Sequence, residues 1–337
     1  MKNLPDITIP LVRPDLRQSD ADIFLQQMAE NPFSDLQLVA QWETAWQEIW
    51  KRPCVAFADP VELLQSLKNI LGWQPGLEIQ TSPLLHPIWQ EAMQSAWLTP
   101  SQNGVITGSG QEIWSDNIGQ TKNLIQHNFG LPAQTSSQQP ATLEDISAIL
   151  KPLPNCGVAN IQLLMLDGNR MIQGGATCLA LSTDESLIKT LKKTRKQPPA
   201  AALCALMLSQ LNQLDALLAR REQLAMAYLD IYSKDSVSKP PLPSSGRRWE
   251  AFIIQLPNRE KRLGLQHFLN KAGIGAAPPI WHHLPTYQNA SSDTSPLTQL
   301  VEKSLALPLY ASLSDGEQKK IINRVHRWID RGGPVGE

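Results

Sequence analysis

Helical and extended spacings of apolar positions alternate along the first two thirds of the chain. Between residues 20 and 49, apolar side chains recur every three or four positions and Pro32 interrupts the pattern, which predicts two helices. Further helical patterns and strand-length apolar runs follow one another at residues 54–57, 59–71, 72–82, 86–97, 121–133, 159–166 and 176–183. This alternation predicts an α/β fold in which helices flank a parallel sheet.

The last third of the chain has a different organisation. Residues 199–228 predict one long helix with apolar side chains on more than one face, which indicates burial against a sheet and a partner alike. The Pro- and Ser-rich stretch at residues 239–248 has the composition of a domain boundary. We therefore predict a large domain over residues 1–238 and a small α+β domain over residues 239–337.

The balanced charge argues against polyanionic partners. The chain has 30 Lys and Arg residues against 31 Asp and Glu residues, so nothing favours nucleic acid or an acidic membrane surface. The N-terminus lacks the apolar core of a signal peptide, and no apolar run reaches the length of a membrane span, so we expect a soluble, cytoplasmic protein. Four cysteines without C-x-x-C spacing indicate neither a disulfide framework nor a zinc site, and no other metal site is expected.

Several stretches spread over most of the chain are similar to one family. They include "IPLVRPDL" near the start, "QLNQLDALLARREQLAMAY" in the long helix, and "LNKAGIGAAPPIWHHLPTY" and "LALPLYASLSDGEQKKIINRV" near the end. Together they resemble the DegT/DnrJ/EryC1/StrS family of sugar aminotransferases, which use pyridoxal phosphate (PLP). The resemblance implies the type I, aspartate aminotransferase-like fold of PLP-dependent transferases. That fold has a large domain with a mixed, mostly parallel sheet flanked by helices, and a smaller C-terminal α+β domain.

The family's cofactor lysine has no counterpart here. It lies a few residues before a Gly-rich turn and a strand, and in "GNRMIQGGATCLALSTD" that pattern puts Arg170 at its position. A lysine amine with a lowered pKa forms a Schiff base with the cofactor aldehyde, whereas a guanidinium stays protonated and is a poor nucleophile. The resemblance therefore implies a chain that cannot hold PLP in the usual covalent form.

The family's phosphate anchors are replaced as well. A Ser-Gly-Thr turn at a helix N-terminus binds the phosphate in the family, and Ala58, Asp59 and Pro60 stand there. The Asp59 carboxylate repels an anion, and Pro60 removes one N–H group. Met165 stands where a phosphate-binding serine is usual. From the residues alone, Asp59 and Glu62 predict a capping box at the start of a helix.

Other cofactor positions are partly retained in the resemblance. Asp145 matches the acidic residue that pairs with the pyridine nitrogen, with Glu144 before it and Ala148 where the family has glutamine. His86 falls where the family places an aromatic ring that stacks on the cofactor. The family's loop into the neighbouring subunit's site, before the long helix, is deleted.

Two interpretations of the remaining polar residues stay open. Arg170 either fills the vacated pocket with a salt bridge to Asp145 or Glu144, or binds an anion or sugar nucleotide through its guanidinium. In the "IWHHLPTY" segment, His282, His283 and Tyr287 either line a ligand cleft or pack on the sheet. The basic run at residues 189–196 predicts a solvated helix end.

The combined losses predict a family member with a degenerate PLP site and no ordinary transaminase activity. We expect a non-catalytic or sugar-nucleotide-binding subunit in nucleotide-sugar or cell-surface polysaccharide metabolism. Its partner would be a second copy or an active paralogue, bound through the helix near residues 203–218. No cofactor is expected. The alternative is an active enzyme that binds PLP or pyridoxamine phosphate (PMP) noncovalently, with Asp145 on the ring nitrogen and His86 against the ring.

Overall fold

The computed structural model organises the chain into two compact units. It describes residues 6–31, 33, 35–102, 105–106, 112–114, 122–135, 142–154, 156–167, 170–232, 246–279, 300 and 302–333. The first, here called the sheet unit, lies within residues 16–215, and the second, the C-terminal unit, combines residues 6–15 with residues 216–333. The division falls just after Asp215, inside a helix, whereas the composition of the chain suggested residues 238 and 239.

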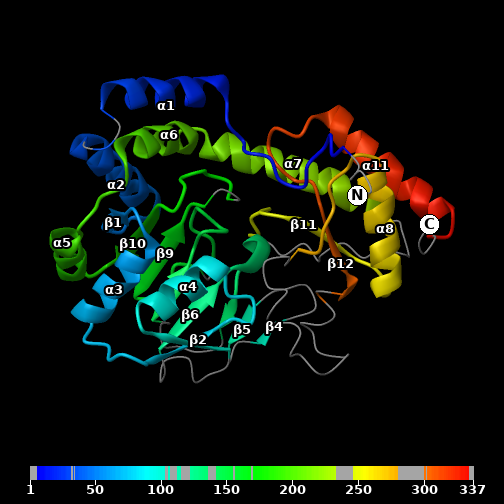
Figure 1. Cartoon of the computed structure of the whole chain (residues 1–337). Coiled ribbons are helices and arrows are strands. Elements are labelled where there is room, and N and C mark those ends of the chain that lie inside the picture. Colours follow the sequence, from blue (N-terminus) through cyan, green and yellow to red (C-terminus); the bar gives the residue numbers. More distant parts are fainter. Residues whose placement is uncertain are drawn as a thin grey trace, which may run out of the picture. The chain divides into compact units, whose positions relative to one another are not determined.

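A seven-stranded sheet forms the centre of the sheet unit (Figure 1), in the order β1-β10-β9-β8-β6-β2-β3. Strand β10 pairs antiparallel with both of its neighbours, and every other pairing is parallel. The mixed, mostly parallel sheet of the sequence analysis is thereby confirmed. Its strands are β1 (Cys54–Phe57), β2 (Glu78–Thr81), β3 (Thr99–Gln102), β6 (Asn123–Gln126), β8 (Leu143–Asp145), β9 (Ile161–Met165) and β10 (Cys178–Ser182). Short strands β4 (Val105–Ile106), β5 (Glu112–Trp114) and β7 (Gln134–Thr135) form a separate sheet.

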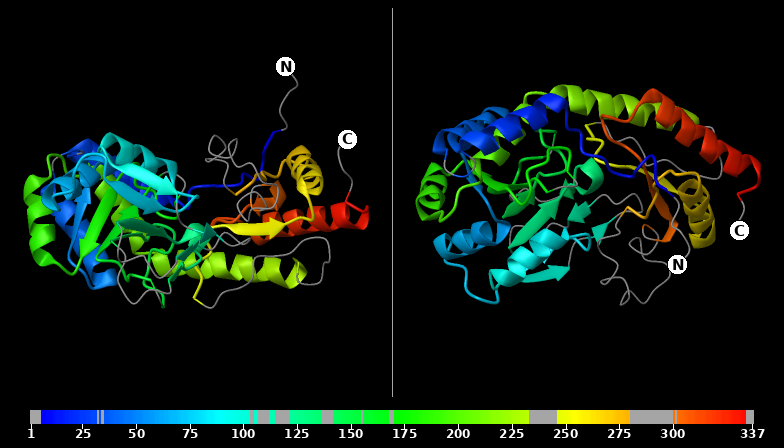
Figure 2. Two further views of the ribbon diagram at one scale, coloured as in Figure 1. Left: turned by 90° about the horizontal axis from the view of Figure 1, so that it is seen from below. Right: turned by 45° about the horizontal axis from the view of Figure 1, so that its top comes forward.

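Helices cover the sheet because their apolar residues recur on one face. Leu63 of α3, Trp89 of α4 and Leu191 of α5 are fully buried in one core cluster with alternate residues of the strands. Helix α6 packs against α1 and α2, and Figures 1 and 2 show α1 running alongside α6. The helices of this unit are α1 (Gln18–Glu30), α2 (Leu36–Trp50), α3 (Pro60–Ile70), α4 (Pro87–Ser95), α5 (Glu185–Thr194) and α6 (Ala201–Leu211).

The C-terminal unit has its own core. It contains α7 (Leu214–Tyr232), β11 (Phe252–Gln255), α8 (Arg259–Lys271), β12 (Ser304–Leu307) and α11 (Asp315–Asp330), and β11 pairs antiparallel with β12. A buried ion pair of Arg221 with Asp15 ties the N-terminal segment to this unit. Arg221 also donates to the Leu309 carbonyl at 3.0 Å, and Asp15 accepts the N–H groups of Ala311 and Ser312.

Two local expectations need correction. The single long helix predicted over residues 199–228 is two helices, α6 and α7, interrupted at residues 212 and 213. The basic run at residues 189–196 is not wholly solvated, because Arg195 and Lys192 both pair with the buried carboxylate of Glu43. Arg195 also donates to the Ala56 carbonyl at 2.7 Å, so the run anchors α5 to the end of β1.

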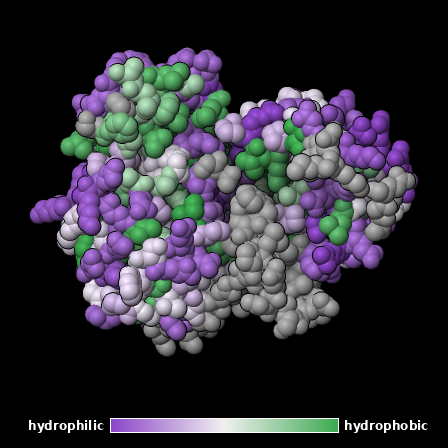
Figure 3. Space-filling model, in the orientation of Figure 1, coloured by the Kyte–Doolittle hydropathy of each residue, from purple (hydrophilic) through white to green (hydrophobic). Residues whose placement is uncertain are grey.

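Apolar side chains gather on an exposed surface over α1, visible at the upper left of Figure 3. We call this surface the α1 patch, and its exposed residues are Ile23, Leu25, Met28, Phe33 and Leu36. Scattered single apolar residues are ordinary on a surface, but a contiguous group indicates contact with another molecule.

No single helix among the described residues is long and apolar enough to cross a membrane. The pair formed by α6 and residues 214–229 passes the same length and composition test only when the two helices are taken together.

Candidate functional site

The strand order brings the positions singled out in the sequence to one edge of the sheet. Strands β1, β9, β8, β6 and β2 all run in the same direction, so their carboxyl ends lie along a common edge. Residues 58–60 follow β1, His86 follows β2, Asp145 ends β8, and Arg170 follows β9. The crevice outside the carboxyl ends of parallel strands is where ligands bind in open α/β sheets.

Asp59 is an ordinary helix cap at this edge. Its Oδ1 accepts the Val61 N–H at 2.9 Å, and Pro60 occupies the first position of α3. The expected capping box does not close, because Glu62 accepts the N–H of Lys196 instead. Asp59 is exposed, so its carboxylate places negative charge where the helix N-terminus would otherwise attract an anion.

His86 is held by hydrogen bonds on both ring nitrogens. Its Nδ1 accepts the Ile88 N–H at 3.3 Å and caps α4, so the ring proton lies on Nε2, which faces Asp167 Oδ2 at 3.1 Å. This contact links the segments that follow β2 and β9. Asp167 was not singled out in the sequence, although an acidic residue directly after a buried strand is a usable signal.

The carboxylate of Asp145 is fully engaged. Its Oδ2 accepts from the Trp89 indole at 3.1 Å and from the Gln126 amide at 3.4 Å. Its Oδ1 accepts the N–H of Ser147 at 3.0 Å and the Ser147 hydroxyl. Ser147 in turn accepts the N–H of Met165 at 2.8 Å, so Asp145 joins β8, β9 and α4. A buried carboxylate with four donors has little capacity left for a ligand.

Arg170 does not form the expected salt bridge with Asp145 or Glu144, because both carboxylates bind other groups of the chain. It is half-buried, and its backbone N–H donates to the Asp167 carbonyl at 3.2 Å. The nearest lysines in the sequence do not replace it. Lys151 pairs with Asp215, and the exposed Lys189 pairs with Glu185 one turn earlier on α5.

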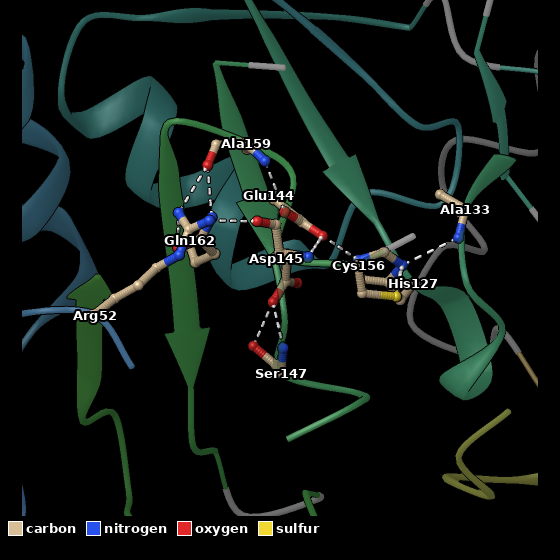
Figure 4. Close-up of polar contacts among 10 residues, drawn as sticks. Arg52, His127, Ala133, Glu144, Asp145, Ser147, Cys156, Ala159 and Gln162 are labelled. Carbon is tan, nitrogen blue, oxygen red and sulfur yellow. Dashed lines mark hydrogen bonds and ion pairs between the residues drawn. The ribbon is translucent and has the colours of Figure 1, made fainter. Parts of the chain in front are cut away.

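Glu144, next to Asp145 on β8, points to the opposite side of the strand and holds a loop (Figure 4). Its Oε1 accepts the N–H of Gly157 at 2.6 Å, and its Oε2 accepts the N–H of Ala159 at 3.0 Å. Arg52 donates to the carbonyls of the same two residues, at 2.6 and 3.2 Å. We call Arg52, Glu144 and the loop between Gly157 and Ala159 the loop clamp.

His127 completes the surroundings of Glu144. Its Nε2 lies 2.8 Å from Glu144 Oε1, and its Nδ1 accepts the Ala133 N–H at 3.0 Å, so the ring carries its proton on Nε2. Burial raises the pKa of Glu144, but the hydrogen bonds from His127 and from the two loop N–H groups outweigh burial and hold the pKa below its usual value.

His127, Glu144 and Cys156 form the one cluster of metal-ligand side chains found among the described residues, with ligand atoms within 4.8 Å of one another. The Cys156 sulfur lies 3.8 Å from His127 Nδ1. A metal ion there would have to displace the backbone N–H donors that already occupy His127 and Glu144. The arrangement therefore fits a hydrogen-bonded support better than a metal centre.

Three of the four cysteines are buried. Cys54, Cys178 and Cys204 are buried, and burial raises the pKa of each thiol, to about 12 for Cys204. Cys156 is half-buried. The proposed ligand loop with His282, His283 and Tyr287 lies outside the residues that the structure describes.

Comparison with known proteins identifies relatives in sequence and in fold. Residues 200–326 match the model of the DegT/DnrJ/EryC1/StrS aminotransferase family, which confirms the resemblance seen in the sequence. No curated protein matches the chain.

Solved structures match nearly the whole chain at low sequence identity. The aminotransferase TlmJ from Streptoalloteichus hindustanus shares 16% identity at a TM-score of 0.80, over 97% of this chain and 100% of its own. The putative sugar aminotransferase Spr1654 from Streptococcus pneumoniae, in its PLP form, shares 15% identity at a TM-score of 0.77. The match covers 96% of this chain and 99% of Spr1654. Helicobacter pylori PseC, an aminotransferase involved in pseudoaminic acid biosynthesis, shares 15% identity at a TM-score of 0.75. The match covers 96% of this chain and 99% of PseC. The predicted type I fold is thereby confirmed.

The side chains at the carboxyl edge do not fit covalently bound PLP. Arg170 supplies no amine, and the Asp59 carboxylate and Pro60 stand at the helix N-terminus where an anion would bind. The partners of Asp145 are side chains and a backbone N–H of the chain itself.

Proposed function

We propose that this chain, which carries the DegT/DnrJ/EryC1/StrS sequence in residues 200–326 and the fold of the sugar aminotransferases, has no ordinary transaminase activity. It acts as a non-catalytic or sugar-nucleotide-binding subunit in nucleotide-sugar or cell-surface polysaccharide metabolism. One observation carries the proposal: Arg170 stands at the position of the cofactor lysine, and both nearby lysines are engaged elsewhere.

The polar groups at the same edge of the sheet support this proposal. Asp145, which would pair with the pyridine nitrogen, is saturated by Trp89, Gln126 and Ser147. His86 caps α4 and pairs with Asp167. Each of these groups stabilises the sheet edge through the chain's own donors and acceptors, and none depends on a bound cofactor.

The first experiment is an absorbance spectrum of the purified chain with and without added PLP, followed by borohydride reduction and intact mass. We expect no retained chromophore and no added mass. The PLP form of Spr1654, treated in parallel, is the positive control. A fixed adduct on this chain would refute the proposal, and peptide mapping would name the lysine that carries it.

The second candidate function is an enzyme that binds PLP or PMP noncovalently. It is favoured by the presence of Asp145 and by neighbours of the same fold whose structures contain PMP, such as Spr1654. This candidate predicts a chromophore that survives gel filtration but is removed by dialysis, without a mass adduct after reduction. The same spectrum therefore separates the two functions.

We further infer that the chain works as a dimer, with a second copy or with an active paralogue. Helix α6, part of the segment expected at the interface, packs against α1 and α2 of the same chain. The α1 patch is exposed and apolar instead, which makes it the better contact surface. Light scattering after size exclusion should give twice the chain mass, and Leu25→Asp should shift it toward the monomer. A wild-type monomer at high concentration would contradict self-association.

The sugar-nucleotide function is tested separately. A half-buried guanidinium at the carboxyl edge suits a diphosphate group, because the planar fork binds two oxygens at once. UDP-sugars should raise the melting temperature of the chain, and Arg170→Met should remove the effect. An unchanged melting temperature of the wild type at millimolar ligand would leave the structural role as the better account.

A further inference from the structure

The C-terminal end of α4 carries a side chain that its geometry does not favour. The Trp97 N–H donates to the Gln94 carbonyl at 3.0 Å, and the Leu98 N–H donates to the Met93 carbonyl at 2.8 Å. These two bonds form a Schellman motif, which places one residue in the left-handed region. That residue is Trp97, with φ of 61°.

The same motif ends three other helices, and each of them uses glycine. Gly72 after α3, Gly273 after α8 and Gly332 after α11 have φ between 66° and 76°. Each glycine and the residue after it donate the two equivalent bonds. Glycine adopts this backbone freely, whereas a bulky side chain is strained there. Helix capping therefore explains the glycines but does not explain Trp97.

Packing does not explain Trp97 either. Its side chain is 71% exposed, so burial does not offset the strain. Strained non-glycine residues persist mainly where the side chain has a function in binding or catalysis. The combination of strain and exposure points to a ligand that contacts the indole ring.

A hollow of about 420 Å³ lies beside this ring, within the size range of small-molecule sites. Gln90 and Gln94 of α4 line it, and neither side-chain amide makes a hydrogen bond within the described part of the chain. The Thr99 side chain at the start of β3 is exposed to the same hollow. The remaining lining residues are Gly76, Thr81, Leu85, Leu98 and Pro100.

The chemistry of the lining selects the class of ligand. None of the described lining residues carries a charge, so the hollow offers no partner for phosphate or carboxylate. Neutral amides and a hydroxyl can donate and accept at once, as sugar hydroxyls require. An exposed indole presents a flat apolar face with negative π density, which suits the polarised C–H groups of a pyranose ring.

We propose that the hollow beside Trp97 binds an uncharged saccharide. One sugar ring stacks on the Trp97 indole, and its hydroxyls bond to the amides of Gln90 and Gln94. This site lies on α4 and the edge strand β3. Trp89 of α4 bonds to Asp145 but does not line the hollow, and the proposal does not rest on the proposed function.

The experiment uses the full chain with maltotriose, cellotriose and chitotriose as probes. Saturation-transfer NMR followed by calorimetry should detect binding of at least one trisaccharide, with a Kd of about 1 mM or below. Trp97→Ala should weaken that binding at least tenfold, while Trp97→Phe should retain it within a few-fold. Leu71→Ala is the matched control, because Leu71 is 37% exposed on the same unit but does not line the hollow.

Trp97→Gly separates the binding role from folding. It should abolish trisaccharide binding and yet raise the melting temperature, by about 2–4 °C, because glycine relieves the left-handed strain. The proposal is overturned if no trisaccharide binds the wild type, or if binding is unchanged in Trp97→Gly. Binding of UDP alone at this hollow, lost in Trp97→Ala, would equally overturn it in favour of a nucleotide.

Discussion

The segment that matches the family model and the edge that would hold a cofactor are constrained in different ways. Residues 200–326 match the family model, and the positions that the resemblance assigns to the cofactor, from Ala58 to Arg170, lie outside that match. The matched segment contains most of the core of the C-terminal unit, where Tyr228, Phe252 and Leu305 are fully buried. Packing constrains such residues wherever the fold persists. A catalytic group is constrained only by its chemistry, so it can be lost while the scaffold remains.

The largest expected effect tests the matched segment. Arg221→Met removes one partner of a buried ion pair and leaves Asp15 with an uncompensated charge. We expect a loss of about 3–5 kcal/mol in the free energy of unfolding, measured by urea denaturation. Arg220→Met is the control, because Arg220 pairs with the exposed Asp315 and should cost less than about 1 kcal/mol. Equal losses would show that burial of the pair does not matter.

A variant at Glu144 tests the loop clamp, which lies outside the segment that matches the family model. Glu144→Gln keeps the shape of the side chain but turns a donor group toward either the Gly157 or the Ala159 N–H. We expect a loss of about 1–3 kcal/mol in the free energy of unfolding. No loss would mean that Glu144 is not a structural residue and is available for a ligand.

The same variant predicts a pH dependence. The pKa of Glu144 is lower in the folded chain than in the unfolded chain, so its stabilisation is complete above the unfolded value of about 4.3. It is lost as the pH falls through the folded pKa. The stability difference between wild type and Glu144→Gln should therefore be larger at about pH 5 than at about pH 3. A difference that grows on acidification would contradict the assignment.

A similar loss is expected at Gly157, in the loop that Glu144 holds. Gly157 has φ of 75°, and a Cβ there would lie 3.1 Å from the Trp50 ring. Gly157→Ala should cost about 1–3 kcal/mol from strain and contact together. Gly72→Ala has similar backbone strain with nothing near the added methyl group. The difference in unfolding free energy between the two variants measures the contact with Trp50. Equal losses would show that this contact contributes nothing.

The smallest expected effect is at the cofactor position. Arg170→Lys restores an amine but leaves Asp59 and Pro60 at the helix N-terminus and Asp145 bound to Trp89. We expect no PLP retained after gel filtration and no mass adduct after borohydride reduction. A stable adduct in this single variant would show that residue 170 alone prevents covalent PLP binding. Asp59, Pro60 and the partners of Asp145 would then not be obstacles to the cofactor.

The sequence by itself determined the alternation of helices and strands in the sheet unit and the family resemblance, which puts Arg170 where a lysine is expected. Apolar spacing is a local property, so β1, β9 and α3 could be predicted with nearly correct bounds. The identity of Arg170 excludes a Schiff base at that position whatever the fold does.

Only the tertiary structure decided what the polar residues bind. Glu144 and Asp145 are adjacent in the sequence, yet they face opposite sides of β8, and neither pairs with Arg170. Their partners include Trp89 and Gly157, which lie in other segments. The apolar pattern of those segments does not predict these hydrogen bonds. The backbone of Trp97 is also invisible in the sequence. Side-chain hydrogen bonds depend on where distant segments meet, and the local pattern of apolar residues does not encode that. The left-handed turn at Trp97 forms within its own helix end, where glycine is the usual signal and is missing.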